Sequence, residues 1–139
     1  MNYGYACINE TLGAGPKKTR ITTNRSMIKR TFKEKGIAYA SELALQNIHD
    51  LIKILAWNED NDIRFYRMSS DIFPWASEYN YYDLPNYREI KYWLHCAGEA
   101  ATKMGHRLTF HPGPFNCMAS PNFEVVEKTY KELNNHSRI

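Results

Sequence analysis

The chain has 139 residues, of which 43% are hydrophobic, and a formal net charge of +3. This length is that of one domain, and no apolar run reaches the roughly 20 residues that a membrane-spanning helix needs, which excludes a membrane protein. Cys7, Cys96 and Cys117 lack the spacing of a zinc finger, and the N-terminus lacks a secretion signal. These features favour an intracellular protein of the cytoplasm, the nucleus or a viral factory, not a secreted one.

The first predicted strand covers residues 3–7, and a long, positively charged loop follows it. Between residues 17 and 35 the chain has eight basic residues and one acidic residue, whereas the rest has ten basic and fourteen acidic residues. Such a concentration is typical of a surface that contacts phosphate. We therefore expect Arg20, Arg25 and Arg30 to bind phosphate groups, and a solvated loop is the alternative.

The remaining elements alternate between helices and strands. Apolar residues recur at helical spacing after Ser41, a candidate N-cap, and again in a stretch that ends at Gly105. Ser120 followed by Pro121 predicts the start of another helix. In chain order we predict a helix over residues 41–58, a strand over 63–68, a helix over 85–104, a strand over 107–111 and a helix from residue 120 onward.

This order predicts an α/β fold with parallel strands and right-handed crossovers. Three strands with helices on one side bury only one face of the sheet, and a (β/α)₈ barrel usually needs about 250 residues. We therefore expect residues 1–139 to form about three βα units of a TIM-type (β/α)₈ barrel, as the incomplete N-terminal part of one domain. The remainder of the barrel, or self-association, would then be needed for a stable fold.

The most informative segment covers residues 107–113, where a short strand ends on His111 and the chain turns on Pro112 and Gly113. Barrels of this class place metal ligands and catalytic groups at the carboxyl ends of their strands. Taken alone, a histidine in this position is more commonly a hydrogen-bonded structural residue. His111 is thus a candidate ligand that needs further support.

Five segments of the chain, in order, resemble the opening part of the UV damage endonucleases: residues 3–12, 36–39, 47–58, 66–75 and 105–113. The resemblance implies a barrel similar to those of AP endonuclease IV and xylose isomerase. It also implies a metal-dependent nuclease that nicks damaged double-stranded DNA on the 5′ side of ultraviolet photoproducts. Mn²⁺ is the cofactor we expect first, with Zn²⁺ or Mg²⁺ as alternatives, and no membrane is involved.

The resemblance also assigns roles to single residues. His111 matches the first histidine of the family's metal cluster, and Asp71 falls where relatives place a side chain next to the metals. Tyr5 and Asn9 match polar positions that line the groove near the active site. From the residues alone, Asp71 could instead satisfy backbone donors of a turn, and Tyr5 could belong to the core.

A dipeptide after the His-Pro-Gly segment is expected to probe the damaged DNA strand. The family typically has glutamine and an aromatic residue there, and this chain has Pro114 and Phe115. Phe115 keeps a ring that can wedge into the base stack, whereas Pro114 lacks the amide. Packing of Phe115 within the protein is the alternative.

Three functions remain open at this stage. The first is a UV-damage endonuclease that is inactive in this form, because one or two ligands cannot hold a two- or three-metal cluster. The second is a non-catalytic remnant of such a barrel with weak affinity for DNA. The third is a metal barrel of the sugar-isomerase type, which the basic loop and the tyrosine-rich start disfavour.

Overall fold

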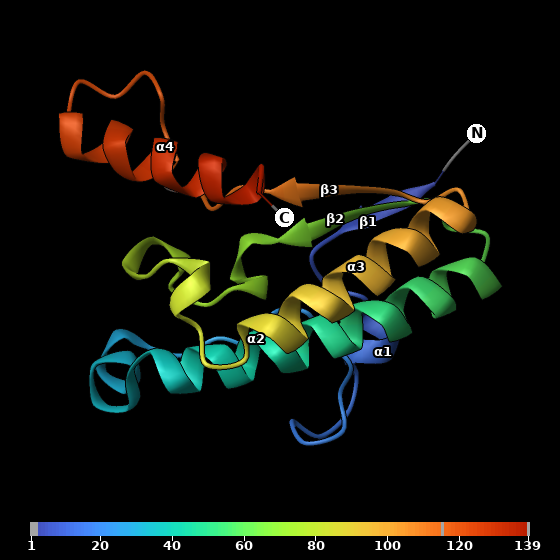
Figure 1. Ribbon diagram of the computed structural model, residues 1–139. Helices are drawn as coiled ribbons and strands as arrows, with labels where there is room; N and C mark the ends of the chain where they lie inside the picture. The colour runs from blue at the N-terminus through green and yellow to red at the C-terminus, as the bar shows by residue number, and fades with distance from the viewer. Residues whose placement is uncertain (1–2, 115, 139) are drawn as a thin grey trace.

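The computed structural model describes residues 3–114 and 116–138. Three parallel strands form one sheet in the order β1–β2–β3 (Figure 1). The strands are β1 (Gly4–Ala6), β2 (Phe65–Ser69) and β3 (Arg107–His111). The helices are α1 (Glu10–Gly13), α2 (Lys29–Asp60), α3 (Tyr87–Lys103) and α4 (Phe123–His136). Short 3₁₀ turns lie between β2 and α3, namely η1 (Ser70–Ile72), η2 (Ala76–Glu78) and η3 (Tyr81–Asp83). The predicted α/β fold with parallel strands is confirmed.

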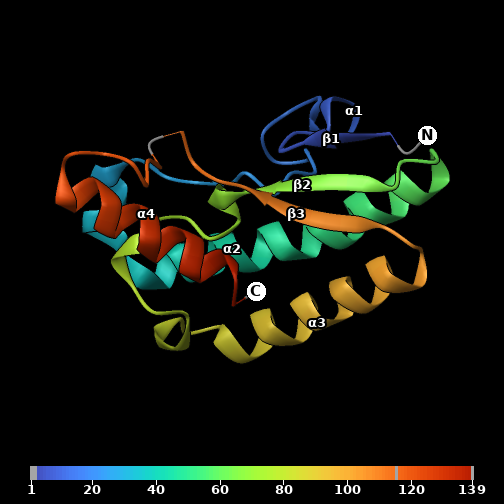
Figure 2. The same cartoon turned by 90° about the horizontal axis from the view of Figure 1, so that it is seen from above.

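The core lies between the sheet and the helices α2 and α3, which cover the same face of it (Figure 1). Side chains alternate between the two faces of a strand, so Tyr66 and Met68 of β2 point into this core, which also contains Ile48 and Leu51 of α2. The other face of the sheet has no helix over it among the described residues (Figure 2). One buried face is what the sequence predicts for three units of a barrel.

Helix α2 begins much earlier than residue 41, so the predicted start of this helix is wrong. It starts at Lys29, and the non-helical Gly36 (φ 65°, ψ −160°) divides it into a short first segment and a longer second one; glycine adopts such a positive φ without steric cost. Ser41 is not an N-cap, because it lies within the helix, where its hydroxyl oxygen accepts a hydrogen bond from the backbone N–H of Asn86 at 3.0 Å. Four of the eight basic residues of the segment are therefore helical and not in the loop.

The other element boundaries lie close to the predicted ones, with one correction at α4. The N-cap of α4 is Asn122, whose side-chain oxygen accepts from the backbone N–H of Glu124 at 2.9 Å. Ser120 instead accepts from the N–H of Asn122 at 3.2 Å and shapes the turn before the helix. Asparagine and serine cap helices about equally well, so the sequence alone did not separate them.

Candidate functional site

Asp71 and His111 lie at the same edge of the sheet, where the neighbouring strands β2 and β3 end. The register pairs Ser69 with His111, and Asp71 follows Ser69 by two residues in η1. The hydroxyl oxygen of Ser69 accepts from the backbone N–H of Asp71 at 3.1 Å, which fixes this turn. Both side chains are exposed. This is the edge at which barrel enzymes place their functional groups.

The surroundings of Asp71 are acidic, and α4 contributes to them. Partial desolvation of the Asp71 carboxyl group, and secondarily the negative charge of Glu132, raise the pKa of Asp71. Both residues line a cavity of about 430 Å³ at this edge, together with Gly113 and His136. Glu132 accepts a hydrogen bond from the backbone N–H of Gly113 at 2.9 Å. Sequence reasoning missed Glu132, because only the position of α4 brings it to the strand ends.

His111 and Asp71 have side chains of types that can bind a metal ion. An imidazole and a carboxylate are suitable ligands for Mn²⁺ and Zn²⁺, and a cation would offset the negative charge of Asp71 and Glu132. Within residues 3–114 and 116–138, however, no group of three or more His, Cys, Asp or Glu residues is placed to hold a metal ion. A complete cluster would need further ligands.

Tyr5 and Asn9 form a hydrogen-bonded chain on the helix-covered side of the sheet. The Tyr5 hydroxyl donates to Oδ1 of Asn58 in α2 at 2.8 Å and accepts from Nδ2 of Asn9 at 2.9 Å. Oδ1 of Asn9 accepts from the backbone N–H of Leu12 at 2.9 Å and so caps α1. Burial raises the pKa of Tyr5. These polar groups are already paired within the protein, and a DNA contact by Tyr5 or Asn9 stays a prediction.

Removing the Tyr5 hydroxyl is expected to destabilise the fold. In Tyr5→Phe, Oδ1 of Asn58 and Nδ2 of Asn9 both lose a partner, which costs about 1–2 kcal/mol of unfolding free energy. Urea denaturation followed by circular dichroism measures this. Tyr92→Phe is the control, because Tyr92 is exposed on α3. Equal stability of the two variants would contradict a structural role of the Tyr5 hydroxyl.

Arg25 is half-buried and its guanidinium is paired within the protein, so a phosphate contact by Arg25 stays a prediction. Its guanidinium pairs with the Asp50 carboxylate at 2.7 Å and donates to the carbonyl oxygens of Thr22 at 2.6 Å and Arg20 at 2.8 Å. Asp50 also accepts from Lys53 at 2.8 Å. Through this pairing, Arg25 anchors the loop to α2. The sequence could not show it, because the pair joins residues that are far apart along the chain.

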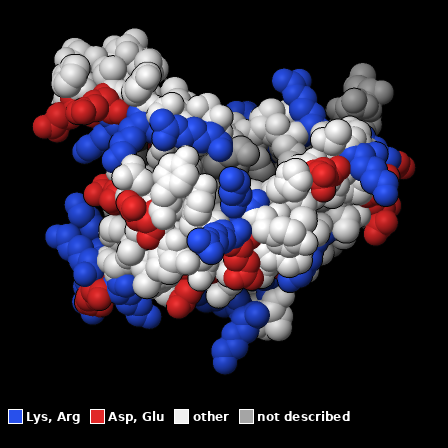
Figure 3. Space-filling model, in the orientation of Figure 1, with Lys and Arg blue, Asp and Glu red and all other residues white. Residues whose placement is uncertain are grey.

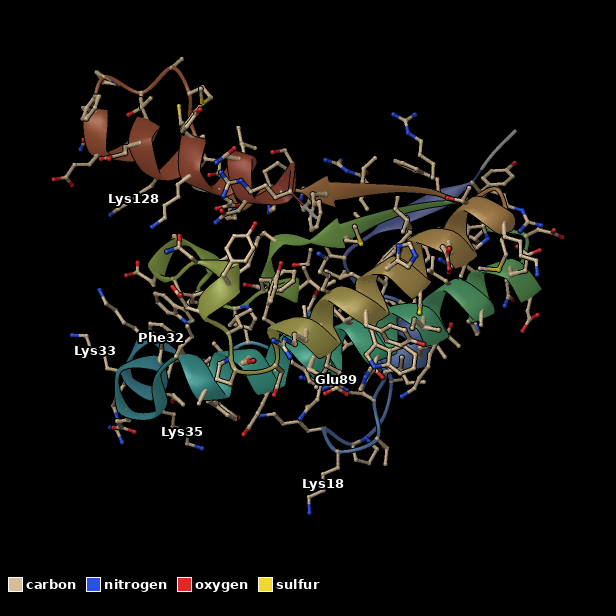
Figure 4. All side chains as sticks on the ribbon, viewed as in Figure 1. Lys18, Phe32, Lys33, Lys35, Glu89 and Lys128 are labelled. Carbon is tan, nitrogen blue, oxygen red and sulfur yellow. The ribbon has the colours of Figure 1, made fainter. Side chains whose placement is uncertain are left out.

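The basic segment divides into two groups that lie at different places (Figure 4). Lys18 lies at the tip of the loop and points away from the sheet, whereas Lys33 and Lys35 lie at the start of α2. Figures 1 and 2 both place the start of α2 at the end of the molecule where the strands end and α4 lies. Figure 3 shows Lys and Arg side chains over the start of α2 and beside α4. The start of α2 is thus the basic group nearest to the strand ends.

The remaining predicted DNA contacts vary in accessibility. Arg30 is exposed at the start of α2, where it pairs with Glu34 at 3.1 Å. Arg20 is half-buried, and Pro114 is exposed after β3. Phe115 lies outside the described residues. A DNA contact by Arg20, Arg30, Pro114 or Phe115 stays a prediction.

Parallel strands with helices on one face are βα units of a TIM-type barrel. Barrels of this class have their functional sites at the carboxyl ends of the strands. The family follows from the sequence. The chain belongs to the UV-endonuclease UvdE family, whose model matches residues 1–139. The resemblance seen in the five segments is confirmed.

Known proteins of this kind are similar over most of the chain. The UV-damage endonuclease of Schizosaccharomyces pombe is 37% identical over 98% of the chain, and that of Neurospora crassa is 43% identical over 76%. A crystal structure of SacUVDE matches 99% of the chain with a TM-score of 0.78 and 26% identity. The chain spans 22%, 16% and 44% of these three proteins, respectively, which is less than half of each. The partial-barrel fold is confirmed.

The helices of the part that the structure describes do not resemble membrane spans. None of them combines the length and the apolar character that crossing a bilayer requires.

Proposed function

We propose that this chain forms the first part of a UV-damage endonuclease, an enzyme that nicks damaged double-stranded DNA with the help of a divalent metal. The observation that carries the proposal is the placement of His111 and Asp71 at adjacent strand ends in a chain whose whole length matches the family. In this proposal both side chains are metal ligands, and Mn²⁺ is the first candidate, ahead of Zn²⁺ and Mg²⁺. The sugar-isomerase alternative has no support from the family match.

Phosphate contacts in this proposal come from the start of α2. Lys29, Arg30 and Lys33 are exposed there, and Lys128 of α4 lies at the same end of the molecule (Figure 4). A DNA backbone lying across this end would pass between the basic start of α2 and Lys128 of α4. In this proposal the negatively charged backbone lies beside the proposed metal ligands without a contact from Arg25.

The second part of the proposal concerns whether the 139-residue chain can bind a metal and cut DNA without further ligands. Because the described residues supply no third ligand beside His111 and Asp71, we propose that the 139-residue chain binds DNA but does not cut it. The same observation supports the second candidate function, a non-catalytic DNA-binding remnant of such a barrel. Residues 1–139 would in both cases be the first part of one barrel domain, stabilised by the rest of the barrel or by self-association.

Binding of duplex DNA is expected to depend strongly on salt. Each neutralised phosphate contributes about −0.9 to the slope of log K against log salt, so three or four contacts give a slope near −3. Replacing Lys29, Arg30 and Lys33 together by alanine should bring the slope to about −1 or smaller in magnitude. Fluorescence anisotropy of labelled duplexes across a salt series measures this.

The matched control changes the other basic group. Replacing Lys17 and Lys18 by alanine removes the same type of charge at the tip of the loop and should leave the slope near −3. If the two variants change the slope equally, DNA responds only to the total positive charge of the protein. The start of α2 is then not the contact surface.

A further inference from the structure

A buried asparagine of α2 connects the basic segment to the strand edge that carries Asp71. Asn47 has no exposed surface, and its carboxamide is fully used in hydrogen bonding. Oδ1 accepts from the backbone N–H of Arg25 at 3.0 Å, and Nδ2 donates to the carbonyl oxygen of Arg25 at 3.0 Å. Nδ2 also donates to the carbonyl oxygens of Asp71 at 3.2 Å and Ile72 at 3.3 Å.

The orientation of this carboxamide is fixed by its partners. A flipped Asn47 would place its oxygen against three carbonyl oxygens and its amino group against an N–H, which would leave buried groups unpaired. Three segments are thereby held in one arrangement: the chain at Arg25, helix α2, and the turn η1. No other residue type of this size supplies both the donors and the acceptor that the site requires.

A second contact joins the same segments. The indole N–H of Trp75 donates to the carbonyl oxygen of Met27 at 2.9 Å, and its ring stacks on Phe32 of α2 with centroids 5.6 Å apart. Phe32 lies beside Lys33 in the first turns of α2 (Figure 4). The basic start of the helix is therefore joined to the chain that follows Asp71.

We propose that Asn47 is a positioning residue for DNA binding: it holds the basic start of α2 at a fixed place relative to Asp71. This inference rests on the proposed function. A surface whose charges are already in place loses less conformational freedom when it binds. Loss of Asn47 therefore weakens DNA binding without changing which side chains contact phosphate.

This role predicts a result that general destabilisation does not. Because Lys29, Arg30 and Lys33 are unchanged in Asn47→Ala, the number of neutralised phosphates and hence the salt slope should stay near −3. The affinity should fall on the order of tenfold at every salt concentration, since ordering the two segments then opposes binding. A change in slope would instead mean that contacts have been lost.

The experiment compares three variants with the unchanged chain by hydrogen exchange and by anisotropy on duplex DNA. In Asn47→Ala, the backbone amide hydrogens of residues 20–28 and of residues 70–76 should both exchange faster than in the unchanged chain. Trp75→Phe keeps the ring on Phe32, loses the hydrogen bond to Met27, and should give the same pattern with a smaller loss of affinity. Asn58→Ala is the control, because Asn58 is equally buried on α2 but accepts from Tyr5 at the other end of the helix.

The outcomes separate the two proposals. Asn47→Ala or Trp75→Phe with wild-type affinity, or exchange that quickens in only one of the two segments, overturns the positioning role. If Asn47→Ala does not fold, Trp75→Phe decides. An unchanged chain that does not bind DNA overturns the proposed function and with it the role of Asn47 in binding, while coupled exchange would still show that the segments are joined.

Discussion

Asp50→Ala is expected to lower the free energy of unfolding by about 3–5 kcal/mol, because it breaks a buried ion pair from one side. The Asp50 side chain is 6% exposed and the Arg25 side chain 18%. Without the carboxylate, the guanidinium of Arg25 is left without its counter-charge, and the backbone N–H of Thr22, which donates to Asp50 at 3.1 Å, loses its acceptor. Urea denaturation measures the effect. Glu42→Ala, an exposed site on the same helix, is the control and should change little.

The same residue predicts how stability depends on pH. Burial alone would raise the pKa of Asp50, but hydrogen bonds from Lys53, Thr22 and Arg25, with the charge of Arg25, outweigh it and lower the pKa. A carboxyl group with a lowered pKa in the folded state stabilises the fold above its unfolded pKa of about 3.9, and this stabilisation is lost as the pH falls through the folded pKa. Asp50→Ala should lack this part of the acid dependence. If the unfolding free energies of Asp50→Ala and of the unchanged chain depend on acid pH in the same way, the stabilising role of the ion pair is contradicted.

The sequence predicted the parallel strands and the strand edge well because these follow from local patterns. Apolar residues at helical spacing identified the part of α2 that faces the core, and the three strands alternated with helices as parallel units require. Once the strands are parallel, Asp71 and His111 must share an edge. That part of the candidate site needed no knowledge of side-chain packing.

The parts that the sequence did not predict depend on long-range contacts. The first turns of α2 are rich in lysine and arginine and lack an apolar stripe. Asn47 and Asp50 are polar residues on a core helix, and only their partners, Arg25 and Asp71, explain them. Side-chain alternation directs Tyr5 towards Asn58, a partner that is far away along the chain, and a place for Tyr5 in a groove near the active site stays a prediction.

His111→Ala is expected to reduce nicking by about 100-fold or more, since changes even to groups that only support a metal ligand cost 10–100-fold. This effect is measurable in a hybrid enzyme in which residues 1–139 replace the matching segment of the Schizosaccharomyces pombe protein. The hybrid would supply further ligands from the relative's own sequence. His95→Ala, an exposed site on α3, is the control and should leave nicking unchanged. A hybrid that keeps its activity without His111 would remove this residue from the metal site.

The most direct measurement of the proposed function is the nicking of ultraviolet-irradiated supercoiled plasmid by the hybrid in millimolar Mn²⁺, with unirradiated plasmid and chelator as controls. We expect metal-dependent nicking of the irradiated plasmid by the hybrid and none by the 139-residue chain alone. A hybrid that folds, as judged by circular dichroism and a cooperative melt, but does not nick irradiated plasmid would contradict the proposal that this chain carries functional endonuclease residues.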